Sequence, residues 1–207
     1  MKCNTDLREW ARMYEKGAVF TAFDTETTGL YCASDRIVEI GAVKFDKNGI
    51  VNTYEVLIHP QIEIPKQAVD VHGISNEMVL SCLAFKEVAL DFLRFTAGTH
   101  LVAHNASFDI GFVNAELKRA GYPTLKAPQL PAADTLQLAQ NAFPSLSKYN
   151  LQFLANTFGI ALDRAHRASD DALACKDVFV RCITQYTQAH PEAIRGELSQ
   201  GQADFLF

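Results

Sequence analysis

Features that mark several classes of protein are missing from this chain of 207 residues. Its five cysteines are odd in number and include no CxxC pair, which argues against a disulfide framework or a cysteine zinc site. No run of about 18 apolar residues occurs, as a membrane-spanning helix would need. The N-terminal segment carries charges throughout and lacks the apolar core of a signal peptide. We therefore expect a cytoplasmic protein with reduced thiols and no membrane contact.

An excess of basic residues is also missing. Lys and Arg number 19 against 24 Asp and Glu, which gives a net charge of -5. This balance excludes a broad basic surface that coats nucleic acid through phosphate contacts alone. It still permits a small pocket in which metal ions neutralise phosphates. The hydrophobic fraction of 48% is that of a globular domain with a sizeable core.

Hydrophobic patterning predicts a mixed α/β fold. Alternation of apolar residues indicates strands at 18–26, 36–46, 51–60 and 99–105. Helical periodicity indicates helices at 6–16, 85–98, 106–122, 133–142, 147–158 and 169–189. Asn48-Gly49 predicts a hairpin between the second and third strands, and the stretch around Pro65 is expected to be irregular. Antiparallel strands followed by alternating helices and strands predict a mixed central sheet flanked by helices.

The segment FDTETTGL places two acids at the end of an apolar strand. Side chains two residues apart in a strand point to the same face, so Asp24 and Glu26 project together. Adjacent carboxylates repel one another unless a proton or a cation lies between them, and Mg²⁺ and Mn²⁺ take oxygen ligands. Taken alone the pair is common, and an Asp that ends the strand beside a solvated Glu26 is the simpler interpretation.

Two later segments, HNASFD and HRASDDA, also combine polar residues with a helix start. Asp109 lies in the first turn of a predicted helix, where the helix dipole favours negative charge. His166 precedes Asp171 by five residues, and a histidine near a metal-bound water can take its proton. The plain alternatives are a first-turn acid and a capping region in which Ser169 and Asp170 also favour a helix start.

The three segments together carry a stronger signal than any one alone. Each lies at the end of a strand or the start of a helix, where side chains converge at one edge of a sheet. Together they supply four acids and one histidine: Asp24, Glu26, Asp109, Asp171 and His166. That set suits two metal ions about 3.5–4 Å apart, which stabilise the attacking and leaving oxygens of a phosphoryl displacement.

These three segments, in this order, resemble the motifs of the DEDDh exonuclease family. The likeness extends to VEIGAVKF, VHGIS, ADTLQLA and NLQFLANTFGI and spans residues 18–186. Within that family the chain resembles the proofreading exonucleases of bacterial replicative polymerases, among them the epsilon subunit of DNA polymerase III. The resemblance implies a ribonuclease-H-like fold and 3′→5′ hydrolysis of nucleic acid to nucleoside 5′-monophosphates.

The resemblance also implies a role for each motif residue. Two Mg²⁺ or Mn²⁺ ions would be held by Asp24, Glu26, Asp109 and Asp171, and the general base would be His166. In family terms Asp24 bridges both ions, Glu26 and Asp171 complete one site, and the remaining acid serves the other. The family spacing from the histidine selects Asp171 rather than Asp170. Arg167 stands where the related branch of the family carries a tyrosine.

A pocket for the terminal nucleotide is implied as well. Its residues would be Thr25, Thr27, Thr28, Leu30, His72, His104, Asn105 and Phe108. Several of them have plain alternatives, since Phe108 can be a core residue and His72 or His104 can satisfy a turn. A local basic rim would consist of Lys148, Arg164 and Arg167. For these three, solvated surface is the simpler interpretation.

We divide the chain into a helical extension at 1–17, an exonuclease domain at 18–190 and a tail at 191–207. The tail resembles the peptide by which polymerase partners bind the sliding clamp, through Gln202, Asp204, Phe205, Leu206 and Phe207. Ala203 and Phe205 depart from that pattern, which has leucine at these positions. A tail that packs on its own domain is the alternative.

The sequence therefore predicts a Mg²⁺- or Mn²⁺-dependent 3′→5′ exonuclease that acts on DNA in proofreading or repair. Its partners would be single-stranded or frayed 3′ ends of DNA, together with a sliding clamp or a replicative polymerase. One alternative is an RNA exonuclease similar to ribonuclease T or oligoribonuclease. The other is a catalytically silent binding module, against which the complete set of acids and His166 argues.

Overall fold

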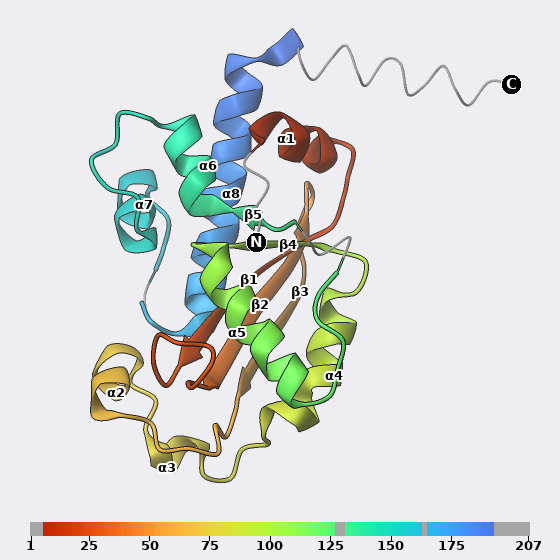
Figure 1. The fold of residues 1–207 in the computed structure, drawn as a ribbon. Helices are drawn as coiled ribbons and strands as arrows, with labels where there is room; N and C mark the ends of the chain where they lie inside the picture. The colour runs from red at the N-terminus through yellow and green to blue at the C-terminus, as the bar shows by residue number, and fades with distance from the viewer. Residues whose placement is uncertain (1–5, 127–130, 163–164, 193–207) are drawn as a thin grey trace, which may run out of the picture.

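The computed structural model describes residues 6–126, 131–162 and 165–192, and this part of the chain is built around one mixed sheet of five strands (Figure 1). The strand order is β3-β2-β1-β4-β5. The strands are β1 (Phe20–Thr27), β2 (Ile37–Asp46), β3 (Gly49–Leu57), β4 (His100–Ala103) and β5 (Ala133–Asp134). β1 pairs antiparallel with β2, as does β2 with β3, whereas β4 runs parallel to both β1 and β5. The predicted mixed sheet is confirmed.

The same residues form eight helices. They are α1 (Leu7–Glu15), α2 (Lys66–His72), α3 (Asn76–Val79), α4 (Phe85–Thr96), α5 (Ala106–Arg119), α6 (Thr135–Ala142), α7 (Leu151–Phe158) and α8 (Ala168–Ala189). All six predicted helices are present, and the largest shift of an end is at α7. This helix begins after residue 150 because the Asn150 side chain accepts a hydrogen bond from the Phe153 N–H at 2.9 Å and caps it. None of these helices is long and apolar enough to cross a membrane.

The sequence did not predict α2, the four-residue α3 or β5. Residues 66–72 lie in the stretch that was expected to be irregular, yet they form a helix between Pro65 and Gly73, whose φ is 72°. Proline before a helix and glycine after it are ordinary start and stop signals, but so short a helix shows too little periodicity to be recognised. Ala133–Asp134, expected to begin a helix, instead pairs with β4.

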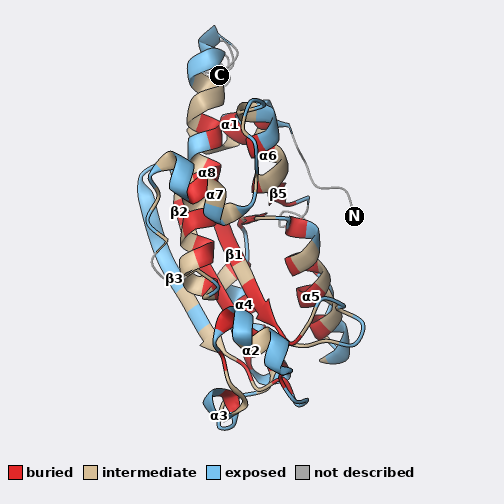
Figure 2. Ribbon diagram, turned by 90° about the vertical axis from the view of Figure 1, so that its left-hand side faces the viewer, coloured by how far each residue is buried: buried red, intermediate tan, exposed pale blue. Residues whose placement is uncertain are grey.

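Helices cover both faces of the sheet (Figures 1 and 2). One face packs against α4 and α5, and Phe23 lies against Phe92 with ring centroids 6.0 Å apart. The other face packs against α8, where Phe20 meets Phe179 at 5.0 Å. Because side chains alternate along β1, Phe23 and Thr25 point to the face covered by α4 and α5. Phe20 lies three residues before Phe23 and therefore points to the opposite face, towards α8.

Helix α1, predicted as an extension, packs into the same core as α8. Its Trp10 is 1% exposed and makes edge contacts with the rings of Phe20 and His100. Leu7 and Ala11 are buried in the same cluster. The extension therefore contributes apolar burial to the domain beside it.

Strand register decides which residues meet at the functional end of the sheet. β1 and β4 are parallel neighbours, so the carboxyl end of β1 lies beside the turn that leads from β4 into α5. The pairing of β1 with β2 sets Asp24 opposite Gly41 and Glu26 opposite Glu39. Helix α8 packs over both strands. The acids of β1 therefore lie where α5 and α8 both begin.

Candidate active site

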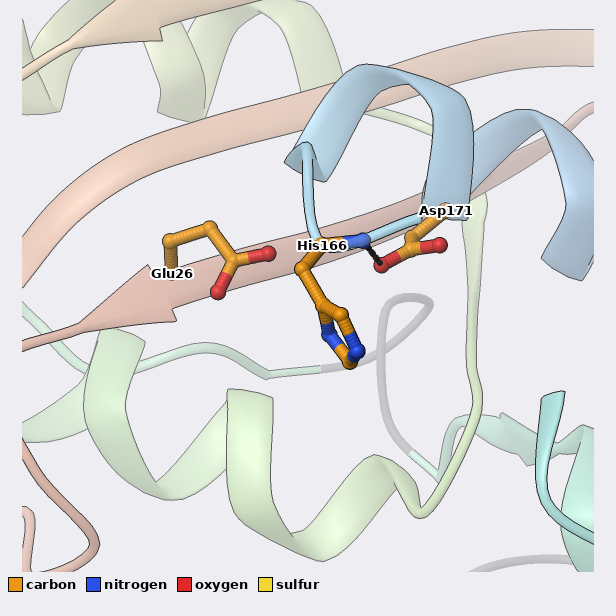
Figure 3. A group of neighbouring side chains, drawn as sticks. All are labelled: Glu26, His166 and Asp171. Carbon is orange, nitrogen blue, oxygen red and sulfur yellow. Dashed lines mark hydrogen bonds between the residues drawn. The ribbon is translucent and has the colours of Figure 1, made fainter. Parts of the chain in front are cut away.

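The end of β1 and the start of α8 bring three of the predicted site residues together (Figure 3). One ligand atom from each of Glu26, His166 and Asp171 lies within 4.8 Å of the others. Both acids are buried and His166 is exposed. The His166 backbone N–H donates a hydrogen bond to Asp171 Oδ2 at 3.1 Å, drawn as the dashed line in Figure 3. Asp170, the neighbouring acid, does not belong to this group.

Asp109 enters the site from α5 and is fixed by β1. It is 2% exposed, and its Oδ1 accepts hydrogen bonds from the Thr25 N–H at 3.0 Å and from the Thr25 hydroxyl at 2.8 Å. These two bonds hold the first turn of α5 against the strand that carries Asp24. Thr25, which was predicted to line the nucleotide pocket, thus also orients this acid through its backbone N–H.

Burial and mutual repulsion act on the two acids of β1. Burial raises the pKa of Asp24 well above its usual range, and the nearby charges of Asp109 and Glu26 raise it further. The pKa of Glu26 rises to about 8, first through burial and then through the charges of Asp171 and Glu39. Without a compensating positive charge, Glu26 therefore holds a proton near neutral pH.

The acids of the two helices follow the same trend. Burial raises the pKa of Asp109 to about 7, although the hydrogen bonds from Thr25 oppose the shift. Burial also raises the pKa of Asp171, against the hydrogen bond from the His166 N–H. Buried carboxylates that face one another are the donor set of a hard divalent cation, which removes both the repulsion and the desolvation penalty. The residues present therefore fit a divalent metal centre.

A cavity of about 410 Å³ opens beside Glu26. Its walls are the end of β1, the following turn, α2 and α5, through Thr25, Glu26, Thr27, Thr28, Gly29, Leu30, Pro65, Gln67, Ala68, Val71, His72 and Phe108. Six of the eight predicted pocket residues are in this set. Leu30 is 75% exposed, so an apolar side chain stands free at the mouth of the cavity. Phe108 is half-buried and packs on the Phe112 ring at 4.9 Å.

The two other predicted pocket residues lie elsewhere. Asn105 lines a neighbouring cavity of about 260 Å³, which shares Leu30 and Phe108 with the first. His104 is directed towards α6, where its Nδ1 lies 2.9 Å from the Thr135 hydroxyl, and burial lowers its pKa to about 4. The contact fits the simpler interpretation, in which His104 has a local structural role, better than it fits a position in the pocket.

Sequence reasoning missed the wall that α2 contributes. Pro65, Gln67, Ala68 and Val71 line the cavity together with the predicted His72. They were overlooked because the stretch was expected to be irregular. The signal that could have found them is the pair of proline and glycine that brackets the helix.

The predicted basic rim is only partly described. Lys148 is exposed, as its simpler interpretation requires, and Arg164 lies outside the described residues. Arg167 does not belong to a basic rim and is not a solvated surface residue, because its guanidinium pairs with the buried Glu39 at 2.5 Å. The predicted clamp-binding residues of the tail also lie outside the described residues.

Residues 21–179 match the Exonuclease (RNase_T) family. The chain belongs to this exonuclease family. It is 41% identical over 190 residues to the DNA polymerase III subunit epsilon of Treponema pallidum, covering 91% of this chain and 87% of that one. It is 38% identical over 164 residues to the PolC-type DNA polymerase III of Caldanaerobacter subterraneus, but spans only 11% of that protein.

Solved structures share the fold of this exonuclease. The nuclease domain of 3′hExo, a DEDDh family member bound to rAMP, superposes with a TM-score of 0.68 at 18% identity, covering 81% of this chain and 92% of that one. The zinc-bound complex of E. coli ExoI with single-stranded DNA gives a TM-score of 0.72 at 18% identity, with coverage of 88% and 43%. The fold is thus ribonuclease-H-like, and the protein is a divalent-metal-dependent 3′→5′ exonuclease similar to the proofreading subunit epsilon.

Proposed function

We propose that this exonuclease removes nucleotides from single-stranded or frayed 3′ ends of DNA and serves in proofreading. The observation that carries the proposal is the buried acid cluster at the wall of a cavity of about 410 Å³. The epsilon relative, matched over 87% of its length, and the single-stranded DNA in the ExoI complex support DNA as the substrate. Because only the last nucleotides need to enter such a cavity, a net charge of -5 is compatible with binding.

Two Mg²⁺ or Mn²⁺ ions would be held by the four acids, with Asp24 between both, Glu26 and Asp171 at one and Asp109 at the other. When bound, the ions supply positive charge to the attacking and leaving oxygens of the phosphate. The hydrogen bonds from Thr25 support this assignment, because they fix Asp109 before any cation arrives.

His166 would take the proton of the attacking water. Its imidazole is exposed and lies beside Glu26 and Asp171, while its backbone N–H is bound to Asp171. A base in this position can exchange its proton with solvent after each turnover. The apolar side chains of Leu30 and Phe108 would contact the terminal base, and the backbone of the turn at Thr27 and Thr28 would contact its sugar.

RNA is the second candidate substrate, because a structural neighbour of the same family binds rAMP. The experiment that separates the candidates compares end-labelled single-stranded DNA, 3′-mismatched duplex DNA and RNA of the same sequence with the purified protein and Mg²⁺. We expect the two DNA substrates to be shortened from the 3′ end faster than the RNA. Faster removal of RNA nucleotides would contradict the proposal and favour a ribonuclease role.

The tail at 191–207 would tether the exonuclease to the sliding clamp of a replicative polymerase through Gln202, Asp204, Phe205, Leu206 and Phe207. The test deletes residues 202–207 and measures binding to the clamp. We expect the affinity to fall while exonuclease activity on free DNA is kept. Clamp affinity that does not change would contradict the tether.

A further inference from the structure

Glu39 is a buried acid without a part in the proposed chemistry. It lies on β2 directly opposite Glu26 and is 0% exposed. It is not a member of the group formed by Glu26, His166 and Asp171. Its hydrogen-bond partners lie instead at the start of α8. A fully buried carboxylate needs such partners, because an unpaired charge in the interior is strongly unfavourable.

The carboxylate of Glu39 binds both the side chain and the backbone at the start of α8. Arg167 Nη2 donates to Oε1 at 2.5 Å, and Arg167 Nε donates to Oε1 at 3.1 Å and to Oε2 at 3.2 Å. The Ala168 N–H donates to Oε2 at 2.9 Å. No side chain at the N-cap position of α8 caps the helix, so this acid from β2 supplies an acceptor. A guanidinium held by a carboxylate through two of its nitrogens is fixed in orientation as well as in distance.

Gly41 shows how closely α8 and β2 approach one another. It lies two residues beyond Glu39, on the same face of the strand, and pairs with Asp24 on β1. A Cβ atom added at this glycine would lie 2.1 Å from the carbonyl carbon of Ala168, which no real side chain permits. The first turn of α8 therefore rests directly on β2, one strand away from the acids of β1.

His166 immediately precedes this anchor and has a strained backbone. Its φ is 66°, in the left-handed region that side chains with a Cβ atom disfavour. Its imidazole is exposed, so its position depends mainly on the backbone that carries it. We propose that Glu39 and Arg167 are positioning residues, whose ion pair holds this turn so that the imidazole stays beside Glu26 and Asp171. This inference rests on the proposed role of His166 as proton acceptor.

Arg167 could instead contact a phosphate of the substrate, since 24% of its side chain is exposed and its Nη2 also reaches Glu55 at 3.3 Å. The geometry favours positioning, because the same Nη2 and the Nε already face the buried Glu39. The two roles differ in kinetics. A phosphate contact made equally in the ground state and the transition state changes KM, whereas a displaced base changes kcat.

The first test replaces the guanidinium with an apolar chain of similar length, Arg167→Met. The matched control is Arg94→Met, which removes an arginine that is 70% exposed and pairs on the surface with Asp91. We expect Arg167→Met to lower kcat by about 10- to 100-fold, because a displacement of about 1 Å can cost that much. The KM of Arg167→Met should stay within about threefold of the wild-type value, and its Mn²⁺ affinity, measured by calorimetry, should not change. Arg167→Lys, which keeps the positive charge, should recover part of the lost rate. A rise in KM at constant kcat would assign Arg167 to the substrate and overturn the inference.

The decisive test repeats Arg167→Met in a His166→Ala background, with rates measured under single-turnover conditions. A residue that acts only through His166 causes no further loss once the imidazole is gone. An additional loss as large as in the wild-type background would contradict the positioning role. If His166→Ala alone keeps full activity, the proposed base is wrong; if His166→Ala is slow but Arg167→Met is not, only the positioning role fails. Should Arg167→Met not fold, Arg167→Lys gives the same comparison at smaller amplitude.

Discussion

The helices α5 and α8 both begin at the carboxyl end of β1, but their first turns are built differently. The start of α5 is closed: Asp109 is 2% exposed and receives two hydrogen bonds from Thr25, while Asp134 of β5 accepts the N–H of Asn105. The start of α8 is open, with an exposed His166 and an Asp171 that is 8% exposed. The more buried side thus fixes an acid, and the more exposed side presents the imidazole.

The two helix starts also have one feature in common, the way in which a backbone N–H is bound. The N-cap residue of α5 is Asn105 and that of α8 is Arg167, and neither side chain makes a capping bond. In each case a buried acid on a strand, Asp134 or Glu39, accepts a backbone N–H instead. The sheet rather than the local sequence therefore fixes where both helices begin, and with them the acids in their first turns.

Removal of an acid from either helix should have the largest effect. Asp109→Asn on the closed side and Asp171→Asn on the open side should each lower kcat by more than about 10³-fold. Each acid is proposed to hold a cation that stabilises the transition state by several kcal/mol. Steady-state hydrolysis of labelled single-stranded DNA measures the loss. Asp170→Asn is the matched control and should keep most of the activity. A loss with Asp170→Asn but not with Asp171→Asn would reverse the assignment of the third motif.

Removal of the imidazole should distinguish the open side from the closed side. His166→Ala should lower kcat by about 10²-fold or more, as the loss of a general base does. Divalent-cation binding, followed by calorimetry, should remain close to that of the wild type, because the acids keep their places. Thr135→Val, which removes the hydroxyl beside the half-buried His104, should leave kcat much closer to wild type. Full activity of His166→Ala would exclude it as the base.

The pH dependence of stability should show the cost of the acid cluster. In the metal-free protein the pKa of Glu26 is raised from 4.5 to about 8, so the folded state binds more protons than the unfolded state between these values. The free energy of unfolding should therefore fall as pH rises from about 5 to about 8 in EDTA. Mg²⁺ or Mn²⁺ should oppose this fall and restore activity, since cations bind the deprotonated acids.

Thermal unfolding across this pH range, with EDTA or with Mg²⁺, measures the effect. Glu26→Gln cannot titrate and should show a shallower pH dependence in EDTA. Stability in EDTA that rises between these pH values would show that the acids do not hold protons in the folded protein. Hydrolysis that continues in EDTA would exclude metal-dependent catalysis.

The smallest effect is expected from Thr25→Val, which tests the closed side. The variant removes the hydroxyl bond to Asp109 and keeps the bond from the backbone N–H. The free energy of unfolding should fall by about 1 kcal/mol, the usual contribution of one hydrogen bond, and kcat should fall less than in His166→Ala. Thr53→Val on the exposed strand β3 is the matched control for the change in side chain. Equal effects of the two variants in denaturant unfolding would show that the hydroxyl bond does not stabilise the site.

Much of the fold follows from local patterns. The strands around the Asn48-Gly49 hairpin and the long helix α8 were predicted because periodicity and turn residues act over a few neighbouring positions. Spacing within β1 likewise predicted that Asp24 and Glu26 share a face. The short elements α2 and β5 escaped prediction because pairing and packing with distant residues, rather than their own propensity, stabilise them.

The sequence by itself determined the inventory of this exonuclease: the acids, the histidine, and the strands and helices that carry them. Tertiary structure alone decided that Glu39 and Arg167, 128 residues apart, join in an ion pair at the start of α8. It also decided that His104 is directed to α6 and that α2 forms a wall of the cavity. The physical reason is that propensity and spacing act locally, whereas burial of a charge depends on partners that only the folded chain brings together.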